Sequence, residues 1–328
     1  MSNLTFPVLQ FLADGQFHSG EALAQQFKVT RATIWNAIKH AKSLGIPIFS
    51  VPGRGYKLPQ AIEFLDKNAV LNAIGEQREW FNLIILDEIA STNTYLMQQK
   101  NVAHATCVAA HIQTKGKGRR GRTWVSQLGA SLTFSLVWRF QCGAAALSGL
   151  SLAVGVALMR TLISFGVNQA KLKWPNDVLV EGKKLAGILI ELHGDLDGPS
   201  MAVIGIGVNL NLPKEVIEAI DQPTIDLNTA SNNTINQNFL LGTLLKHLTE
   251  VLSRFEQFGF VGFRDEWVNY HAYHQQPVRM LLPNGTEVLG LVNNVADDGI
   301  LLVETSLGLQ RFSAGEISLR AVNTGDTA

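Results

Sequence analysis

The chain has 328 residues, enough for two or three domains, and its 46% apolar content allows a sizeable core and excludes wholesale disorder. Its formal net charge is zero and its pI is about 7.1, which excludes a protein that binds polyanions over its whole surface. With only two cysteines, a disulfide framework and a thiolate metal site are excluded as well.

The charge is unevenly placed along the chain. Residues 1–60 carry six cationic side chains against two acidic ones, so a small basic domain precedes a larger, mildly acidic region. The first apolar run lacks the preceding cationic residue of a signal peptide. The uncharged run over residues 140–159 is rich in Ala, Gly and Ser and is closed by Arg160, which favours a core helix over a membrane span. We therefore expect a soluble, cytoplasmic protein with no membrane partner.

Residues 1–60 have the pattern of a winged helix-turn-helix. Short helices are predicted over residues 7–13 and 21–27, the second capped by Ser19. Thr30 caps a third helix, in which Ile34 and Ile38 recur at helical spacing, and a hairpin with a cationic tip follows over residues 47–58. The third helix suits the major groove of DNA. The expected DNA contacts are Arg31, Thr33, Asn36, Lys39 and Arg54.

A three-helix protein-interaction module is the alternative for this region, since helix-turn-helix spacing alone is weak evidence. Trp35 does not distinguish these two functions. A large aromatic side chain beside the outward face is a contact to a DNA base, a contact to a partner protein, or part of the packing between the helices.

A connector over residues 59–75 leads to a central α/β domain, expected to span residues 61–273 with mixed strands. Helices are predicted over residues 145–165 and 237–257. Longer strands are predicted over residues 82–89, 106–112, 131–138, 185–192 and 201–208.

The segment from Lys115 to Arg122 contains five cations, three glycines and no acid. Glycine lets the backbone fold closely around a ligand, and the cations suit a phosphate or carboxylate. Mutual repulsion predicts a poorly ordered loop until an anion binds. A P-loop is excluded, because Arg122 stands in place of its lysine and a strand follows where a helix is needed. A solvated basic loop and an RNA-binding patch are the alternatives.

Two further motifs follow. Lys173-Trp-Pro-Asn-Asp177 and Lys184-Leu-Ala-Gly187 flank a turn, and a hairpin there would bring Asp177 close to Lys184. Such a pair could serve phosphate and Mg²⁺, or accept a proton. Gly205-Ile-Gly207-Val-Asn209 lacks the third glycine of a dinucleotide fingerprint. Its two glycines leave one strand face bare, where a flat ligand can lie.

In this order, these motifs together with Ser91-Thr-Asn93 and Gln113 resemble those of biotin protein ligases. With the winged helix-turn-helix ahead of them, the chain resembles the bifunctional bacterial ligases that also repress the biotin operon. The likeness covers essentially the whole chain. It implies a central domain of the biotin/lipoyl ligase type and an SH3-like β-barrel over residues 274–328, where strands are predicted at 277–282, 287–293, 300–304 and 310–313.

The resemblance implies a two-step reaction. Biotin and MgATP give biotinyl-5′-AMP and pyrophosphate, and a lysine of the biotin carboxyl carrier protein of acetyl-CoA carboxylase then displaces AMP. Neither step needs an enzyme nucleophile, so positioning and charge stabilisation should carry the catalysis. The adenylate-bound protein is expected to form a homodimer that occupies operator DNA and represses biotin synthesis.

Site roles follow from the same resemblance. The catalytic residues are expected to be Lys184, Arg119, Arg122 and Asp177, with Asp177 also the Mg²⁺ ligand. Biotin is expected to contact Ser91, Thr92, Asn93, Gln113, Lys117, Gly118, Arg119, Lys184, Gly205 and Gly207. ATP and the adenylate are expected to contact Gly116, Arg122, Trp124, Asn176, Asn209 and Arg320.

The structural alternatives are that Ser91 is a helix N-cap, Trp124 a core residue and Arg320 an exposed structural residue. Lys117 replaces the first arginine of the family's usual Gly-Arg-Gly-Arg, which keeps the charge and loses the planar fork. The alternative functions are a lipoyl-type ligase and a transcription factor that senses an acidic metabolite without chemistry.

Overall fold

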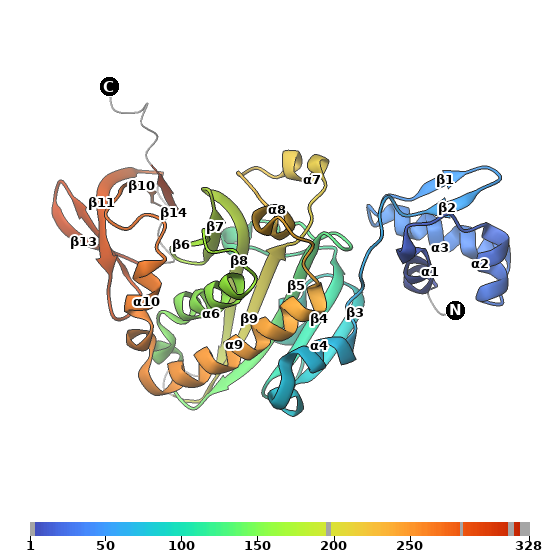
Figure 1. The fold of residues 1–328 in the computed structure, drawn as a ribbon. Coiled ribbons are helices and arrows are strands. Elements are labelled where there is room, and N and C mark those ends of the chain that lie inside the picture. The colour runs from blue at the N-terminus through green and yellow to red at the C-terminus, as the bar shows by residue number, and fades with distance from the viewer. Residues whose placement is uncertain (1–3, 195–197, 283–284, 314–317, 322–328) are drawn as a thin grey trace, which may run out of the picture.

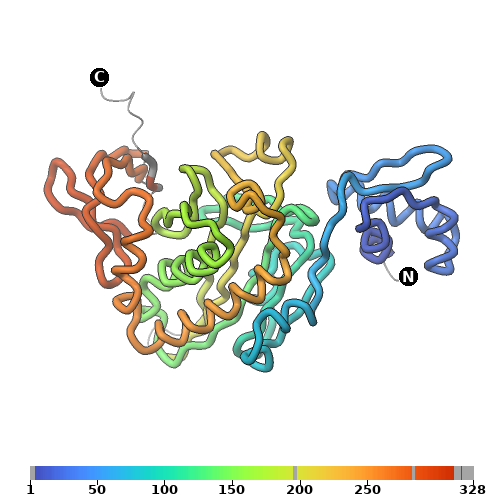
Figure 2. The backbone as a smooth tube through the Cα atoms, viewed as in Figure 1, coloured from blue at the N-terminus to red at the C-terminus, as the bar shows by residue number. Residues whose placement is uncertain are grey.

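The computed structural model describes residues 4–194, 198–282, 285–313 and 318–321. Three units follow one another along the chain, and the first and last lie at opposite ends of the central one (Figure 1). The backbone trace in Figure 2 shows the same arrangement. The predicted fold class, with helix-turn-helix, α/β and small β units in this order, is confirmed.

The N-terminal unit is a winged helix-turn-helix. It contains α1 (Thr5–Phe11), η1 (Leu12–Asp14), α2 (Gly20–Gln26), α3 (Arg31–Ser43) and the hairpin β1 (Phe49–Val51) and β2 (Gly55–Lys57). The predicted caps form: the Ser19 side chain accepts a hydrogen bond from the Ala22 amide, and that of Thr30 from the Thr33 amide. Ile34 and Ile38 are buried, as their helical spacing predicted.

The predicted connector over residues 59–75 is only partly irregular, which corrects the expectation. From Lys67 to Ile74 the chain forms α4, capped by Asp66, followed by η2 (Gly75–Trp80). Val70 and Ile74 lie one helical turn apart and are buried in the central core. The helix forms because this apolar pair covers the sheet together with α9 (Gln237–Phe258).

The central unit is a seven-stranded sheet with the order β3-β4-β5-β9-β8-β7-β6. Among the described strands only β3 and β4 are parallel, so the predicted mixed sheet is confirmed. The strands are β3 (Asn82–Ile89), β4 (Thr106–Gln113), β5 (Ser131–Phe140), β6 (Lys171–Lys173), β7 (Asp177–Val180), β8 (Lys183–Gly194) and β9 (Ser200–Asn209).

Helices α6 (Leu150–Ser164) and α9 pack with α4 on one face of this sheet (Figure 1). The predicted helix over residues 145–165 is interrupted, because Gly149 adopts φ +80° between η4 (Ala144–Leu147) and α6, where a side chain would collide with Phe260. The stretch Ala144–Ser164 is apolar enough to cross a membrane, but 67% of its most apolar window is buried inside the protein, as in a core helix.

The other face carries the short helix α5 (Thr92–Gln98), which packs on β4, β5, β8 and β9 and leaves the rest of that face open. Smaller elements of the unit include α7 (Lys214–Ala219), α8 (Leu227–Ser231), η5 (Phe260–Gly262) and α10 (Arg264–Asn269).

The C-terminal unit is a five-stranded antiparallel sheet with the order β13-β12-β11-β10-β14. Its buried side chains join the central core, and the indole nitrogen of Trp174 donates a hydrogen bond to the Gly299 carbonyl, 3.0 Å away. The strands are β10 (Pro277–Leu281), β11 (Glu287–Val295), β12 (Leu301–Thr305), β13 (Gly308–Phe312) and β14 (Ser318–Ala321).

The helix-turn-helix unit is seated on the end of β4. The buried imidazole of His111 lies between the rings of Phe6 and Phe64, with centroid distances of 6.0 and 4.9 Å. Ile112 and Leu128 of the central unit join the N-terminal apolar cluster. Both residues flank the cationic loop in the chain, so the helix-turn-helix unit contacts the base of that loop.

Candidate active site

A pocket lies on the sheet face that α5 leaves open, above three glycines of adjacent strands, Gly187, Gly205 and Gly207. A β-carbon at Gly207 would collide with the Trp124 indole, and one at Gly205 with the Asn93 amide. The bare strand face predicted for a flat ligand therefore exists. Trp124 and Asn93 are the flat groups that lie against it.

The start of α5 forms one wall of the pocket. Ser91 is indeed a helix N-cap, because its hydroxyl accepts from the Thr94 amide at 3.4 Å, and it also lines the pocket. The Gln113 side-chain oxygen accepts from the Thr92 amide at 2.8 Å and from the Thr92 hydroxyl at 3.1 Å. The predicted biotin-contacting residues Ser91, Thr92, Asn93 and Gln113 are thus brought together from two elements.

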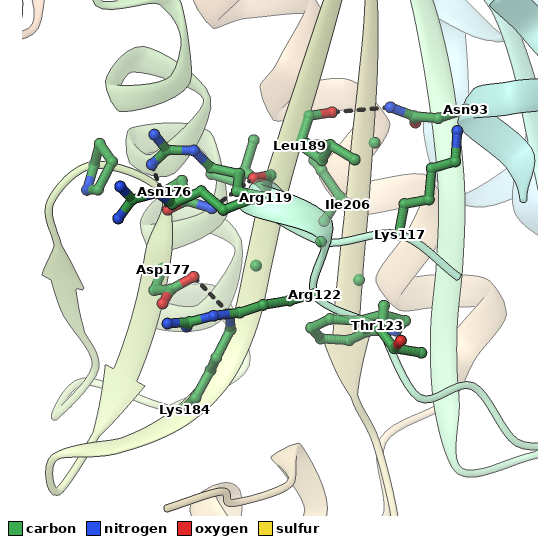
Figure 3. Close-up of a pocket in the computed structure, with 18 of the residues that line it drawn as sticks. Asn93, Lys117, Arg119, Arg122, Thr123, Asn176, Asp177, Lys184, Leu189 and Ile206 are labelled. Atoms are coloured by element: carbon green, nitrogen blue, oxygen red, sulfur yellow. Dashed lines mark hydrogen bonds and ion pairs between the residues drawn. The ribbon is translucent and has the colours of Figure 1, made fainter. Parts of the chain in front are cut away.

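The cationic loop folds back on itself as a small hairpin. The Trp124 amide donates to the Gly116 carbonyl at 2.9 Å, and the Gly118 amide donates to the Arg122 carbonyl at 2.7 Å. The tip is η3 (Arg119–Gly121), where Arg120 and Gly121 both have a positive φ. Lys117 and Arg119 consequently point toward the pocket from the same short segment (Figure 3).

Arg119 is held on the floor by Asn176. Its guanidinium donates to the Asn176 side-chain oxygen at 3.1 Å, while the Asn176 amide nitrogen donates to the Ile188 carbonyl at 2.8 Å. Burial lowers the pKa of Arg119, and the nearby Asp177 carboxylate opposes that shift. The Arg119 guanidinium is therefore held at the floor of the pocket by Asn176.

The predicted hairpin contact is confirmed. The ammonium group of Lys184 lies 2.7 Å from a carboxylate oxygen of Asp177, with side chains only 16% and 15% exposed (Figure 3). Lys184 also lies over the Trp124 ring, 5.9 Å from its centroid. Trp124 is half-buried, and its indole N–H has no hydrogen-bond partner among the described residues, so Trp124 serves the pocket rather than the core.

The charge of the pocket favours an anionic ligand. Six cationic side chains line it against one carboxylate, that of Asp177, among the residues the structure describes. The cationic side chains are those of Lys117, Arg119, Arg120, Arg122, Lys173 and Lys184. Lys184 forms an ion pair with that carboxylate, and six cations against one acid leave the lining of the pocket with a net positive charge.

The residues suit a metal ion carried by a nucleotide, not a dedicated metal site. In the described part of the chain, no group of three or more His, Cys, Asp or Glu side chains could hold a metal. Asp177 provides a single, half-buried carboxylate. Mg²⁺ is commonly held by one carboxylate together with substrate phosphates, so this donor set fits Mg²⁺ only with ATP present.

Three predicted nucleotide contacts lie elsewhere. The Asn209 amide nitrogen donates to the carbonyls of Lys184 and Ile225, each at 3.2 Å, so Asn209 is buried beneath Lys184 and does not line the pocket. Gly116 lies under Trp124, where a side chain would collide with the Trp124 carbonyl. Arg320 belongs to β14 beside the pocket-lining Leu319, and its side chain is outside the described part of the structure.

The predicted DNA contacts lie on the winged helix-turn-helix. The side chains of Arg31, Asn36, Lys39 and Arg54 are exposed. Thr33 is half-buried and its hydroxyl lies 3.0 Å from that of Thr30. Trp35 is 54% exposed beneath the Lys39 ammonium, which excludes packing between the helices as its role.

Two polar residues behind the α5 wall were missed from the sequence. The hydroxyl of Ser135 on β5 lies 2.6 Å from that of Thr92, and the carboxylate of Glu191 on β8 accepts from the Asn93 amide at 2.8 Å. A serine inside an apolar strand and a glutamate near a strand end carry no distinctive sequence signal.

Comparisons with known proteins agree with this arrangement. The family model described as the biotin/lipoate A/B protein ligase family matches residues 86–209. A helix-turn-helix domain model matches residues 6–57, and the C-terminal domain model of biotin protein ligases matches residues 274–320.

The chain is 36% identical to "Bifunctional ligase/repressor BirA" of Salmonella typhimurium, covering 98% of this chain and 99% of that one. The protein of the same name from Escherichia coli is 34% identical with the same coverage. Among solved structures, the biotin protein ligase of Aquifex aeolicus in complex with biotin and ATP is similar, with a TM-score of 0.64 and 30% identity over 74% of this chain and 99% of that one.

Proposed function

The chain belongs to the biotin protein ligase family, in which relatives spanning its full length are ligase and repressor at once, and we propose that it has both activities. It converts biotin and ATP to biotinyl-5′-AMP, transfers the biotinyl group to a lysine of the carrier protein of acetyl-CoA carboxylase, and represses biotin synthesis genes. The observation that carries this proposal is the juxtaposition of a polar α5 wall with a cationic pocket in a chain that begins with a winged helix-turn-helix.

In the first step the biotin carboxylate attacks the α-phosphorus of ATP. A carboxyl-oxygen-to-phosphorus bond forms, the bond from that phosphorus to the bridging oxygen breaks, and pyrophosphate leaves with the electron pair. Arg119, Arg122 and Lys184 bring positive charge to the oxygens where negative charge increases. The α5 wall holds the ureido ring, which fixes the carboxylate at the cationic end of the pocket.

The nucleotide is expected along the edge formed by Trp124, whose ring offers a stacking surface for adenine. Asn176 contributes by holding Arg119, and Asn209 by holding the backbone of Lys184. When bound with ATP, Mg²⁺ would screen the phosphate charge, with Asp177 as its protein ligand.

In the second step the amine of the carrier lysine attacks the acyl carbon of the adenylate. An amide bond forms, the acyl-oxygen bond breaks, and AMP leaves as a phosphate anion that the same cations stabilise. The lysine nitrogen must lose a proton as the amide forms, and Asp177 is the carboxylate available to accept it, once phosphate has drawn Lys184 away from it.

The repressor activity rests on α3 and the β1–β2 hairpin, whose exposed cationic side chains suit the major groove and the neighbouring backbone. Specific binding generally needs two half-sites, so the repressing form is a homodimer. Beyond Ile188 the described residues of β8 pair with β9 alone, which leaves a free sheet edge for pairing with a second copy. A role at operator DNA with MgATP as substrate supports a cytoplasmic protein.

One experiment separates this proposal from its alternatives. Pyrophosphate release is measured with MgATP and biotin, lipoate or octanoate as the acid. Release with biotin alone supports the proposal, release with lipoate or octanoate supports a lipoyl-type ligase, and release with none of them supports a sensor without chemistry. The operator is tested separately by footprinting with biotin and MgATP.

A further inference from the structure

A chain of five hydrogen-bonded side chains runs behind the biotin pocket from β4 to β8. Gln113 contacts Thr92, Thr92 contacts Ser135, Ser135 contacts Asn93, and Asn93 contacts Glu191. Thr92 and Asn93 are 3% and 4% exposed and Ser135 is fully buried, so water does not compete for the contacts among these three residues, whereas Gln113 and Glu191 at the two ends are half-buried. Glu191 is the last side chain of this hydrogen-bonded series and the only one that carries a formal charge.

The direction of each hydrogen bond follows from the partners. The Asn93 amide faces the Leu189 carbonyl at 3.2 Å (Figure 3) and the Glu191 carboxylate at 2.8 Å, and both groups only accept. The amide nitrogen must therefore point toward them and the amide oxygen toward Ser135. The Ser135 hydroxyl, 2.5 Å away, donates to that oxygen.

With its hydrogen committed to Asn93, the Ser135 hydroxyl can only accept from Thr92. The single hydroxyl hydrogen of Thr92 is then shared between Ser135 and the Gln113 oxygen. Thr92 is left with lone pairs for a ligand. Gln113, whose oxygen is turned to the Thr92 amide, is left with the two hydrogens of its amide nitrogen.

We propose that Glu191 is a positioning residue that sets the polarity of Ser135 and Thr92, so that Thr92 offers an acceptor to the ureido group of biotin, beside the donors of Gln113, whose amide is oriented by the Thr92 backbone N–H. The inference rests on the proposed function and concerns one part of it. A ureido group has one carbonyl acceptor and two N–H donors, so a wall with the opposite polarity would place like groups together. Glu191 does not line the pocket and acts through Asn93.

The carboxylate has this effect because it is charged and strictly an acceptor. Hydrogen bonds to a charged group are stronger than those between neutral groups. In its absence, only the neutral Leu189 carbonyl would hold the Asn93 amide, so a flip of that amide, and with it a reversal of the Ser135 and Thr92 hydroxyls, would cost less free energy. Asn93 cannot move away to escape the mismatch, because its amide fills the space above Gly205.

The test compares two nearly isosteric variants in the full-length chain. Glu191→Gln keeps a neutral acceptor for Asn93, whereas Glu191→Met keeps the length and removes the acceptor. His193→Met is the control, since His193 is an exposed residue on the same face of the same strand. Biotin-dependent pyrophosphate exchange gives kcat and KM for biotin and for ATP, and thermal unfolding reports the integrity of each variant.

We expect Glu191→Met to raise the KM for biotin about tenfold or more, with kcat and the KM for ATP within twofold of wild type. Glu191→Gln, which is neutral and no longer strictly an acceptor, should raise the KM for biotin to a value between those of wild type and Glu191→Met. Ser135→Ala should raise the same KM, and the double variant with Glu191→Met should be no worse than the poorer single variant, because both act through Asn93.

Additive losses, an equal rise in the KM for ATP, or a Glu191→Met variant with the wild-type KM for biotin would overturn the proposal. If Glu191→Met is too unstable to assay, Glu191→Gln and Ser135→Ala provide the same comparison. Wild-type protein that gives no biotin-dependent exchange would instead refute the proposed function.

Discussion

The ion pair between Lys184 and Asp177 has two roles that mutation can separate. Replacement of Lys184 by methionine removes a cation from the phosphoryl centre and leaves the Asp177 carboxylate 15% exposed without its partner. Breaking a buried pair typically costs about 3–5 kcal/mol. Asp177 keeps some solvent and the field of Arg119, so we expect the free energy of unfolding to fall by about 2 kcal/mol.

The rate of pyrophosphate exchange should be affected more strongly than the free energy of unfolding. The loss of one preorganised group at a developing charge costs about 100- to 1000-fold in rate. In the double variant Lys184→Met/Asp177→Asn the orphaned charge is gone, so the free energy of unfolding should return to within about 1 kcal/mol of wild type. Pyrophosphate exchange should be no faster than in the Lys184→Met single variant.

The assay pairs guanidinium unfolding with biotin-dependent pyrophosphate exchange on the wild type, the two single variants and the double variant. Lys214→Met is the matched control, because Lys214 forms an exposed pair with Glu218 at 3.7 Å that contributes little. Recovery of exchange together with stability in the double variant would refute a direct role of Lys184 at phosphorus. A single variant as stable as wild type would refute the burial argument.

Three other predictions concern the remaining parts of the molecule. Burial lowers the pKa of His111 from 6.5 to about 4. As the pH falls, the unfolded state therefore binds the proton first, and the free energy of unfolding decreases by up to about 3 kcal/mol between about pH 6.5 and pH 4. His111→Phe should flatten that part of a pH titration of the unfolding free energy. Gly207→Ala should displace Trp124 and raise the KM for ATP about tenfold, with a smaller change in the KM for biotin. An unchanged KM for ATP would contradict the proposed stacking of adenine on Trp124. Biotin with MgATP should protect residues 115–122 from trypsin and raise the dimer fraction in sedimentation, whereas equal cleavage with and without ligand would remove ligand-driven ordering of the loop.

The sequence predicted most of the fold because the relevant signals are local. Capping residues and helical spacing identified α3, and runs of branched apolar residues identified the long strands. The errors arose where packing between distant segments decides the structure. Helix α4 is stable through its contacts with α9, and the break at Gly149 follows from the approach of Phe260, neither of which is visible in the local sequence.

Only part of the site could be predicted from the sequence, and that part depended on a short hairpin and on the order of the motifs. Asp177 and Lys184 are joined by a short hairpin, so their contact could be inferred directly from the sequence. Ser91 and Gln113 meet only through the parallel pairing of β3 and β4, and here the ordered resemblance of motifs supplied what spacing could not. The position of Asn209 under Lys184 was not foreseen, because a strand-end amide serves a ligand and a backbone carbonyl equally well.

The central claim is that one chain activates biotin and attaches it to protein. Its most direct test is intact-mass spectrometry of the apo carrier domain of acetyl-CoA carboxylase after incubation with this protein, biotin and MgATP. We predict that the carrier gains the mass of one biotinyl group on its acceptor lysine, only when biotin and ATP are both present and not when lipoate replaces biotin. A carrier whose mass is unchanged, or one modified by lipoate as readily as by biotin, would contradict the account.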